Sequence, residues 1–462
     1  MRRILSVTIL LLVILSALPA LTDDELLVKV ESDNLDIKKA RSDYASSLLD
    51  VKDAKAGMGP TIDMTITGTY MYNPPIGPIT VSTDNLLKQM SDQGVDVSAY
   101  SGLRNSYLKL YDGMEHTYYS FSLTITQPLV TWGKILNAIK LYEKVSEVRL
   151  LQVSSLTRQN KSKLLGYADA VYYLRNMQAL LAEEQETASR LVEITKSMRD
   201  NGMMLEEDLL KVRIQAQQVD VGMREVEMQL ENQVLGIQNL CNDPSLSLDM
   251  LSHVPDEDAM WALLSEGQEV LVAKATSGTL DSLQMLTRMQ EVADYSKNIS
   301  SASVNWKPDI ALQASLGYGG SRFPLIEKDW YRQDDSTMNF TIAVKSTIYD
   351  GGKKIRDVKR SKEKVEGSAI DYQNAIVQIR SQVITSCLSM ELDSSKLAYQ
   401  KLKIESDEKD MQRKKELFDS GYGNESDYLQ ARLTWQNDRM EQWKLLLDAA
   451  VQYRTLSYLS GV

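Results

Sequence analysis

The feature that most constrains the fold of this chain is a pair of very long helical segments of equal length, each bounded by glycines. They run from Gly133 to Gly202 and from Gly352 to Gly421, so the matching glycines lie 219 positions apart at both ends. At 1.5 Å per residue, each segment of about 68 residues would form a rod of roughly 100 Å. A rod of this length cannot be buried in a globular core and must pack beside other rods. The equal spacing predicts an internal repeat.

Four short strands accompany the rods. Strict alternation of apolar and polar residues predicts them at about 60–71, 118–130, 308–319 and 337–349. Side chains with hydroxyl or amide groups occupy most of the alternate positions, so each strand has one polar and one apolar face. The apolar positions are Ile62, Met64, Ile66, Phe121, Leu123, Ile125, Ile310, Leu312, Phe340, Ile342 and Val344.

The order of these elements predicts two tandem repeats after an export signal. Arg2 and Arg3 followed by the apolar run Ile4–Leu18 indicate a signal peptide over residues 1–20, and no long apolar run follows it. Each repeat begins with a helix, predicted from about Thr22 to Ala56 and from about Ser265 to Val304. The repeats span 21–241, with a helical hairpin at 133–241 and its tip near 202, and 265–462, with a hairpin at 352–460 and its tip near 421. Residues 242–264 form a linker between them.

Composition and motifs argue against several function classes. The net charge of −11 disfavours a nucleic acid partner, because phosphate binding needs an excess of Lys and Arg. His116 and His253 have no metal-ligand spacing and are interpreted as surface or loop histidines. Cys241 and Cys387 are interpreted as separate thiols. The glycine-rich stretch 317–320 is interpreted as a turn. We therefore predict no enzyme, no metal and no cofactor.

Strands of about ten residues are long enough to cross a bilayer as tilted barrel strands. A sheet in lipid cannot keep open edges, and four strands are too few to close a barrel, since the smallest membrane barrels have about eight. If these strands lie in a membrane, several copies of the chain must share one barrel. The alternative is a soluble sheet with one wet face, which the alternation alone would favour.

With its repeat, its strand-to-helix turns and its two tips, the chain resembles the TolC family of outer-membrane efflux proteins. The turns are Gln127-Pro-Leu-Val-Thr-Trp-Gly-Lys134 and Ser346-Thr-Ile-Tyr-Asp-Gly-Gly-Lys353. The resemblance implies a mainly α fold with a membrane β part. Three chains would build a 12-stranded β-barrel in the outer membrane, continued by a periplasmic α-helical barrel. It also implies a homotrimer that works with a periplasmic adaptor and an inner-membrane transporter.

The resemblance also assigns roles to the tips. Gly202, Met203, Gly421 and Tyr422 would mark the surface where the adaptor docks. Asp427, and Asp208 at the matching position of the first repeat, would line the channel aperture. For both acids the alternative to a role in the aperture is a structural one, because a carboxylate in the first turn of a helix stabilises that helix. Gly423 and Gln430 replace a basic and an acidic residue of some members, which leaves the latch of the aperture undefined.

The leading functional prediction is a passive outer-membrane exit duct of an efflux system. Export of proteins by a type I secretion system is the alternative within the family. A periplasmic coiled-coil scaffold without a pore is the alternative of another class. The polar insert over 72–116 is expected outside the cell, with no role assigned.

Overall fold

The computed structural model describes residues 21–111, 113, 115–304, 307–320 and 336–461. The predicted signal peptide lies outside this range. The chain divides into two compact units. The first, here the helical unit, comprises residues up to Val51, Leu141–Tyr295 and Arg360 onward. The second, here the sheet unit, comprises Lys52–Lys140 and Ser296–Lys359.

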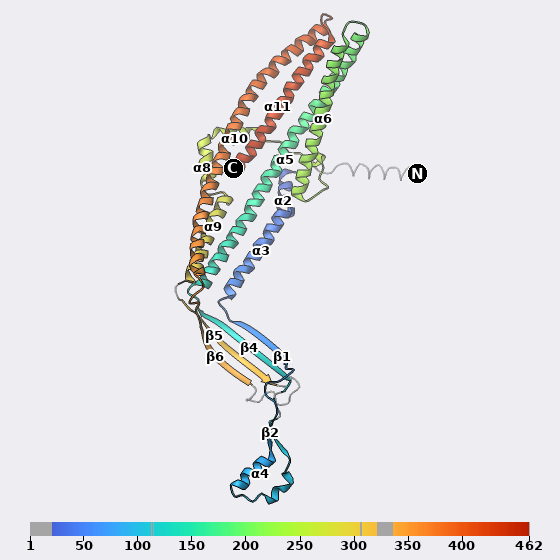
Figure 1. Cartoon of the computed structure of the whole chain (residues 1–462). Helices are drawn as coiled ribbons and strands as arrows, with labels where there is room; N and C mark the ends of the chain where they lie inside the picture. The colour runs from blue at the N-terminus through green and yellow to red at the C-terminus, as the bar shows by residue number, and fades with distance from the viewer. Residues whose placement is uncertain (1–20, 112, 114, 305–306, 321–335, 462) are drawn as a thin grey trace, which may run out of the picture. The chain divides into compact units, whose positions relative to one another are not determined.

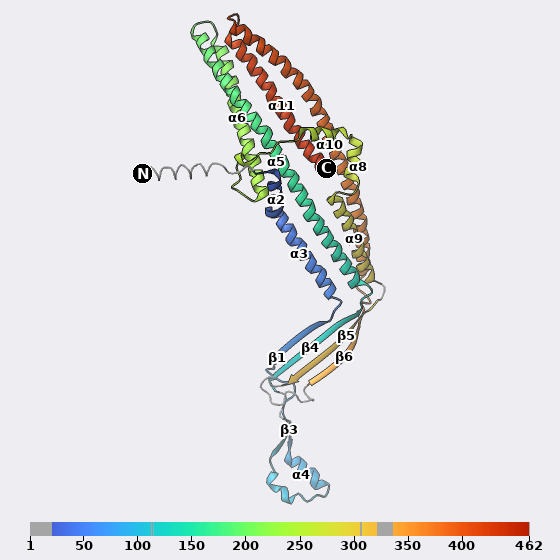
Figure 2. The same ribbon diagram turned by 180° about the vertical axis from the view of Figure 1, so that it is seen from behind.

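Two antiparallel helical hairpins dominate the helical unit (Figures 1 and 2). The long arms α5 and α10 have 67 residues each, and the returning arms α6 and α11 have 36 each. Shorter helices lie beside them. The helices, some of which run into the sheet unit at one end, are α2 (Asp23–Asp33), α3 (Leu35–Ala56), α5 (Lys134–Asp200), α6 (Glu206–Cys241), the 3-10 helix η2 (Leu248–Met250), α7 (Glu257–Ser265), α8 (Gln268–Thr276), α9 (Asp281–Ala302), α10 (Lys353–Asp419) and α11 (Glu425–Ser460).

Two apolar clusters run along the rods instead of forming one round core. In α5 the buried residues Leu164, Val171, Leu174 and Leu181 follow spacings of seven and three, the period of a coiled-coil seam. They pack in a cluster with α2 and α6. A second cluster joins α7, α8 and α9 to α10 and α11. The hairpins are therefore held by long seams, and the short helices cover part of their length.

The single helix predicted from Ser265 to Val304 is wrong. The structure divides this stretch among the end of α7, α8 and α9. Gly267 (φ +90°) and Gly278 (φ +83°) occupy the left-handed region at the two breaks. Glycine adopts that conformation without a steric penalty, so each break is placed by its glycine.

The interpretation of His253 as a surface or loop histidine is also wrong in its exposure. Its side chain is 8% exposed and lies between two carboxylates, Asp23 Oδ2 and Asp169 Oδ1, each 2.7 Å from a ring nitrogen. Asp169 is itself paired with the guanidinium of Arg454 in α11. His253 thus links the linker to α2 and α5. Although burial opposes it, the two carboxylates raise the pKa of His253 above its ordinary value.

We predict that His253 makes the helical unit more stable in mild acid than in mild base. A raised folded pKa means that the stabilisation is fully present below the unfolded pKa of about 6.5 and is lost as the pH rises through the folded value. His253→Gln should cost about 1–3 kcal/mol near pH 6 and less near pH 8.5. Urea unfolding across this range measures the difference. His116→Gln in the sheet unit is the control, and equal pH slopes for wild type and His253→Gln would contradict the prediction.

The sheet unit contains one four-stranded antiparallel sheet in the order β1-β4-β5-β6 (Figure 1). Its strands are β1 (Thr61–Tyr70), β4 (Thr117–Val130), β5 (Asp309–Gly320) and β6 (Ser336–Lys345). Strand β6 ends at Lys345, four residues before the end predicted from the alternation. The insert between β1 and β4 forms a separate small sheet and two short helices: β2 (Ile79–Ser82), α4 (Thr83–Asp92), the 3-10 helix η1 (Ser98–Leu103) and β3 (Tyr107–Tyr111).

The interpretation of residues 317–320 as a turn is wrong, because they belong to β5. A Cβ at Gly319 would lie 2.2 Å from the hydroxyl oxygen of Tyr118, and a Cβ at Gly317 would lie 2.8 Å from Oγ1 of Thr337. These glycines therefore leave room for side chains of the neighbouring strands to cross β5.

Candidate functional site

The strand register brings all eleven predicted apolar positions onto one face of the sheet. Residues directly opposite each other in an antiparallel pair point to the same face. The pairs Ile62–Ile125, Met64–Leu123, Ile66–Phe121, Ile310–Val344, Leu312–Ile342 and Ala314–Phe340 continue this face from β1 to β6. The register adds Leu316 and Met338, which pair with each other and were not among the predicted positions.

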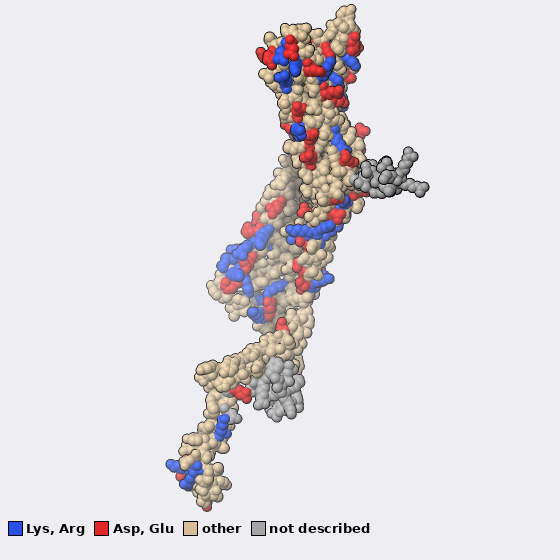
Figure 3. Space-filling model, turned by 90° about the vertical axis from the view of Figure 1, so that its right-hand side faces the viewer, with Lys and Arg blue, Asp and Glu red and all other residues tan. Residues whose placement is uncertain are grey.

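The opposite face of the sheet is polar. It carries Asp63, Thr124, Ser315 and Asn339 in one row across the four strands. On the apolar face the edge residues are well exposed, with Met64 at 64% and Phe340 at 69%. The part of the sheet seen in Figure 3 bears few charged side chains. An apolar face of this extent indicates a surface that something else covers.

None of the helices in the described part of the chain combines the length and apolarity that a membrane-spanning helix needs.

The first strand-to-helix turn is held to β5 by its own motif residues. Trp132 donates from Nε1 to the carbonyl oxygen of Pro308 at 2.8 Å, and the Lys134 ammonium pairs with Asp309 at 2.8 Å. Lys307 lies 5.5 Å above the Trp132 ring. Trp132 and Gly133 both have positive φ, +52° and +82°. The turn motif therefore fixes where α5 begins.

The tip of the first hairpin is a short loop between α5 and α6. Gly202 adopts φ +74°, and the amide of Met203 donates to the carbonyl of Met198 at 2.9 Å, which ends α5. The Met203 side chain is 71% exposed. Arg199 pairs with Glu206 at 2.6 Å across the loop, so an ion pair joins the two arms.

The second tip also has a glycine with positive φ after the end of its long helix. Gly421 adopts φ +75°, and the amides of Tyr422 and Gly423 both donate to the carbonyl of Leu417. Tyr422 is 88% exposed. A Cβ at Gly423 would lie 3.0–3.2 Å from Cβ and C of Leu417 and from N of Phe418. A larger residue at position 423 would therefore crowd the neighbouring backbone, a constraint that sequence reasoning missed.

The two predicted aperture acids occupy matching places with different neighbours. Asp208 lies in the first turn of α6, where Lys211 approaches it at 3.4 Å. Asp427 lies in the first turn of α11 and is exposed, and Asn424 donates to it at 3.4 Å. The position three residues after Asp427 holds neutral Gln430, whereas Lys211 holds the matching position after Asp208. Of the two, Asp427 is the carboxylate without a cation on its own helical face.

One ion pair connects the two hairpins near the tips, and sequence reasoning did not find it. Arg190 of α5 pairs with Glu425 of α11 through two contacts, 3.0 Å from Nε and 3.3 Å from a terminal nitrogen. Arg190 also contacts Glu193 at 2.7 Å. The partners are 235 positions apart, and no local motif marks them.

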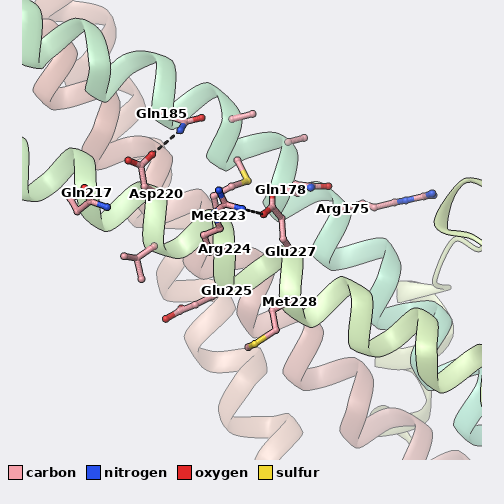
Figure 4. A pocket seen from close by; sticks show the side chains of 13 residues that line it. Arg175, Gln178, Gln185, Gln217, Asp220, Met223, Arg224, Glu225, Glu227 and Met228 are labelled. Atoms are coloured by element: carbon pink, nitrogen blue, oxygen red, sulfur yellow. Dashed lines mark hydrogen bonds and ion pairs between the residues drawn. The ribbon is translucent and has the colours of Figure 1, made fainter.

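A surface groove of about 1020 Å³ lies along α5 and α6 (Figure 4). Gln185 donates to Asp220 at 2.7 Å between the two helices, and Arg224 pairs with Glu227 within α6. Met223 and Met228 add flexible apolar surface. Charges of both signs also crowd the tip end of the helical unit in Figure 3. The chemistry of this groove suits contact with another protein surface.

Among the described residues, no group of three or more His, Cys, Asp or Glu side chains could hold a metal ion. Cys241 and Cys387 are free thiols and both are buried. Burial raises the pKa of Cys241 to about 11, so this thiol is poorly reactive.

Comparison with known proteins shows which family the C-terminal part of the chain is similar to. Residues 280–462 match the model of the outer membrane efflux protein family. The resemblance predicted from the sequence is confirmed. A search of curated proteins found no match.

Solved structures show a similar fold over nearly the whole chain. The CmeC outer membrane channel of Campylobacter jejuni is 13% identical, with a TM-score of 0.69 over 95% of this chain and 86% of that one. The outer membrane protein VceC of Vibrio cholerae is 12% identical, with a TM-score of 0.68 over 95% and 96%. The MtrE outer membrane channel of Neisseria gonorrhoeae, in its open state, is 10% identical, with a TM-score of 0.65 over 95% and 88%. The mainly helical chain with its four-stranded sheet matches the fold of these channels.

We predict that Gly423→Ala loosens the second tip. The added methyl group must displace backbone atoms, and such overpacking typically costs about 1–3 kcal/mol. Hydrogen exchange of residues 415–430 should become at least several-fold faster. Gly367→Ala in α10 is the matched control, because a Cβ there meets no atom within 4 Å. Unchanged exchange in Gly423→Ala would show that the close contact imposes no constraint.

Proposed function

We propose that this chain is the outer-membrane exit duct of an efflux system, through which small molecules leave passively. The observation that carries the proposal is the four-stranded sheet whose eleven predicted apolar positions all lie on one face. The membership of its C-terminal part in the outer membrane efflux family supports the same conclusion.

Closure of the sheet requires other copies of the chain. Within the described residues, β1 and β6 are the edges of the sheet. Lipid offers no hydrogen-bond partners to an open edge, and membrane barrels have at least about eight strands. Three chains with four strands each would give the 12-stranded barrel that the resemblance implies. The eleven apolar positions would then face lipid, and the polar row with Asp63 would face the lumen.

The helical hairpins would extend into the periplasm as an α-helical barrel, with the tips as its inner mouth. Gly202, Met203, Gly421 and Tyr422 would mark the surface where a periplasmic adaptor docks. An inner-membrane transporter would supply the energy, since a duct performs no reaction of its own. The insert over 72–116 would lie on the cell exterior, at the end of the strands away from the helices.

Reconstitution of the purified protein in a planar bilayer tests the proposal. A duct should give discrete, long-lived conductance steps. Absence of conductance from correctly folded protein would leave the non-pore scaffold as the better account. Type I protein secretion would be the better account under two conditions. The purified protein must conduct, and cells that lack it must accumulate an exported protein while staying resistant to toxic small molecules.

We predict that Asp427 makes the mouth favour cations. In a trimer three copies of this carboxylate would converge, and removing them changes the local energy of an ion by an amount on the order of 1 kcal/mol. Asp427→Ala should reduce the cation-to-anion permeability ratio about fivefold and weaken block by divalent cations. Asp208→Ala is the matched control and should have a smaller effect, because Lys211 already compensates Asp208. Unchanged selectivity and block in Asp427→Ala would remove it from the aperture.

We also predict that the Arg190–Glu425 pair holds the two hairpins of one chain together near the mouth. Partly exposed ion pairs contribute about 0.2–1 kcal/mol, which corresponds to a shift of up to about fivefold between closed and open populations. Glu425→Gln should therefore raise the fraction of time in the larger conductance state. The exchanged pair, Arg190→Glu with Glu425→Arg, should restore closure. Failure of the exchange to restore it, with both variants folded, would argue against a direct latch.

A further inference from the structure

A polar cavity of about 450 Å³ lies between the α5–α6 hairpin and the α10–α11 hairpin. We call the contact between these two hairpins the hairpin seam. Glu184 of α5 lines the cavity and is only 3% exposed, while its neighbours Glu183 and Glu186 are exposed. A charged carboxylate at a coiled-coil seam is costly unless it is paired, because the seam removes it from water.

The groups that face Glu184 across the cavity come from three helices. Helix α6 contributes the neutral amides of Gln215 and Gln218. Helix α10 contributes Lys403, whose ammonium is bound to Asp438 of α11 at 2.5 Å. Because Asp438 already holds Lys403, that cation is not free to neutralise Glu184.

Helix α11 also contributes Lys444, whose positive charge lowers the pKa of Glu184 and so opposes the effect of burial. Lys444 is about half exposed and lies 3.7 Å from Glu441, so it is a weak partner for a buried acid. A second acid titrates nearby, since the hydrogen bond with Asp438 raises the pKa of Asp407 to about 6. The seam thus holds a buried carboxyl with incomplete charge compensation.

The same stretch of α11 contains a second sign of loose polar packing. Gln436 is fully buried, and both polar atoms of its side chain lack a hydrogen-bond partner among the described residues. Unpaired buried polar groups weaken an interface, because water could satisfy them if the interface opened. The cavity and Gln436 together mark a part of the helical unit in which polar groups are buried without full compensation.

We propose that Glu184 is a proton-operated switch of the hairpin seam. Protonated, it remains in the closed seam as a neutral polar group. Ionised, it favours an arrangement in which water enters the cavity and the hairpins part. Only the effect of the switch on the duct rests on the proposed function, because the same two hairpins carry the tips of the proposed mouth. The duct would then open more readily as the pH rises.

The direction follows from the cost of burial. Burial raises the pKa of Glu184 to about 7, and Lys444 opposes the shift. For an acid with a raised pKa in the closed state, closure is most stable below the ordinary value. It weakens as the pH rises to about 7 and then stays constant.

Hydrogen exchange of the full-length protein in detergent tests the switch. Peptides over 178–190 and 430–442 report opening of the seam, and the wild-type rate is divided by the Glu184→Gln rate at each pH to cancel the intrinsic pH dependence of exchange. The ratio should rise about tenfold or more between pH 5.5 and 7.5 and level off above that. Glu186→Gln, with an exposed side chain on the same helix, should exchange like wild type.

Lys444→Gln provides a second variant that leaves Glu184 in place. Without the ammonium, the plateau should move to higher pH. A ratio that does not change with pH would overturn the proposal, and so would a plateau that stays at the same pH in Lys444→Gln. If pH-dependent opening persists in Glu184→Gln, the switch belongs to another group such as Asp407. Exchange needs only folded hairpins, so a protein that gives no conductance but shows this pattern would refute the duct and leave the switch intact.

Discussion

The unpaired edges of the four-stranded sheet are the constraint on which the account depends. Within the described residues, strands β1 and β6 each present backbone N–H and C=O groups on one side, and the face between them is mostly apolar, with Gln127 and Ser336 as polar members. Such a sheet is stable in lipid only if the edges meet other strands. The apolar positions lie on one face and the polar row with Asp63 lies on the other, as the wall of the proposed pore requires.

The helical unit follows a different principle. Rods of 67 residues bury narrow seams, and their stability is distributed along the length instead of residing in one core. Near the tips, the Arg190–Glu425 ion pair between the two hairpins is partly exposed. Around Glu184 the seam is polar and hollow. A structure built in this way can remain folded while its hairpins separate at one end.

The sequence predicted the periodic features and missed the pairings between distant segments. The alternation of apolar and polar residues assigned Ile62 and Phe340 to the apolar faces of their strands, because successive side chains in any β-strand point to opposite faces. The glycines 202 and 421 marked the tips because each ends a helix in a left-handed turn. By contrast, His253 was interpreted as a surface or loop histidine, and its burial in a loop was missed because its partners Asp23 and Asp169 come from α2 and α5.

Local geometry explains the remaining differences. From the sequence, Gly423 was interpreted only as the replacement of a basic residue. In the structure it lets the chain pass close to the backbone of Leu417 and Phe418. The breaks at Gly267 and Gly278 interrupt a stretch whose apolar spacing reads as one helix. Neither a close contact nor a helix packed on a neighbour can be derived from period alone, since both depend on which segments fold against each other.

The number of chains in the purified particle tests the central claim most directly. Light scattering with the detergent contribution subtracted gives the protein mass of the particle extracted from the membrane. Our account predicts three chains, the number that the family resemblance implies, because three four-stranded sheets can close a 12-stranded barrel and leave no free edge at β1 or β6. A particle that contains a single folded chain in the membrane fraction would contradict it, since a four-stranded sheet would then stand in lipid with both edges open.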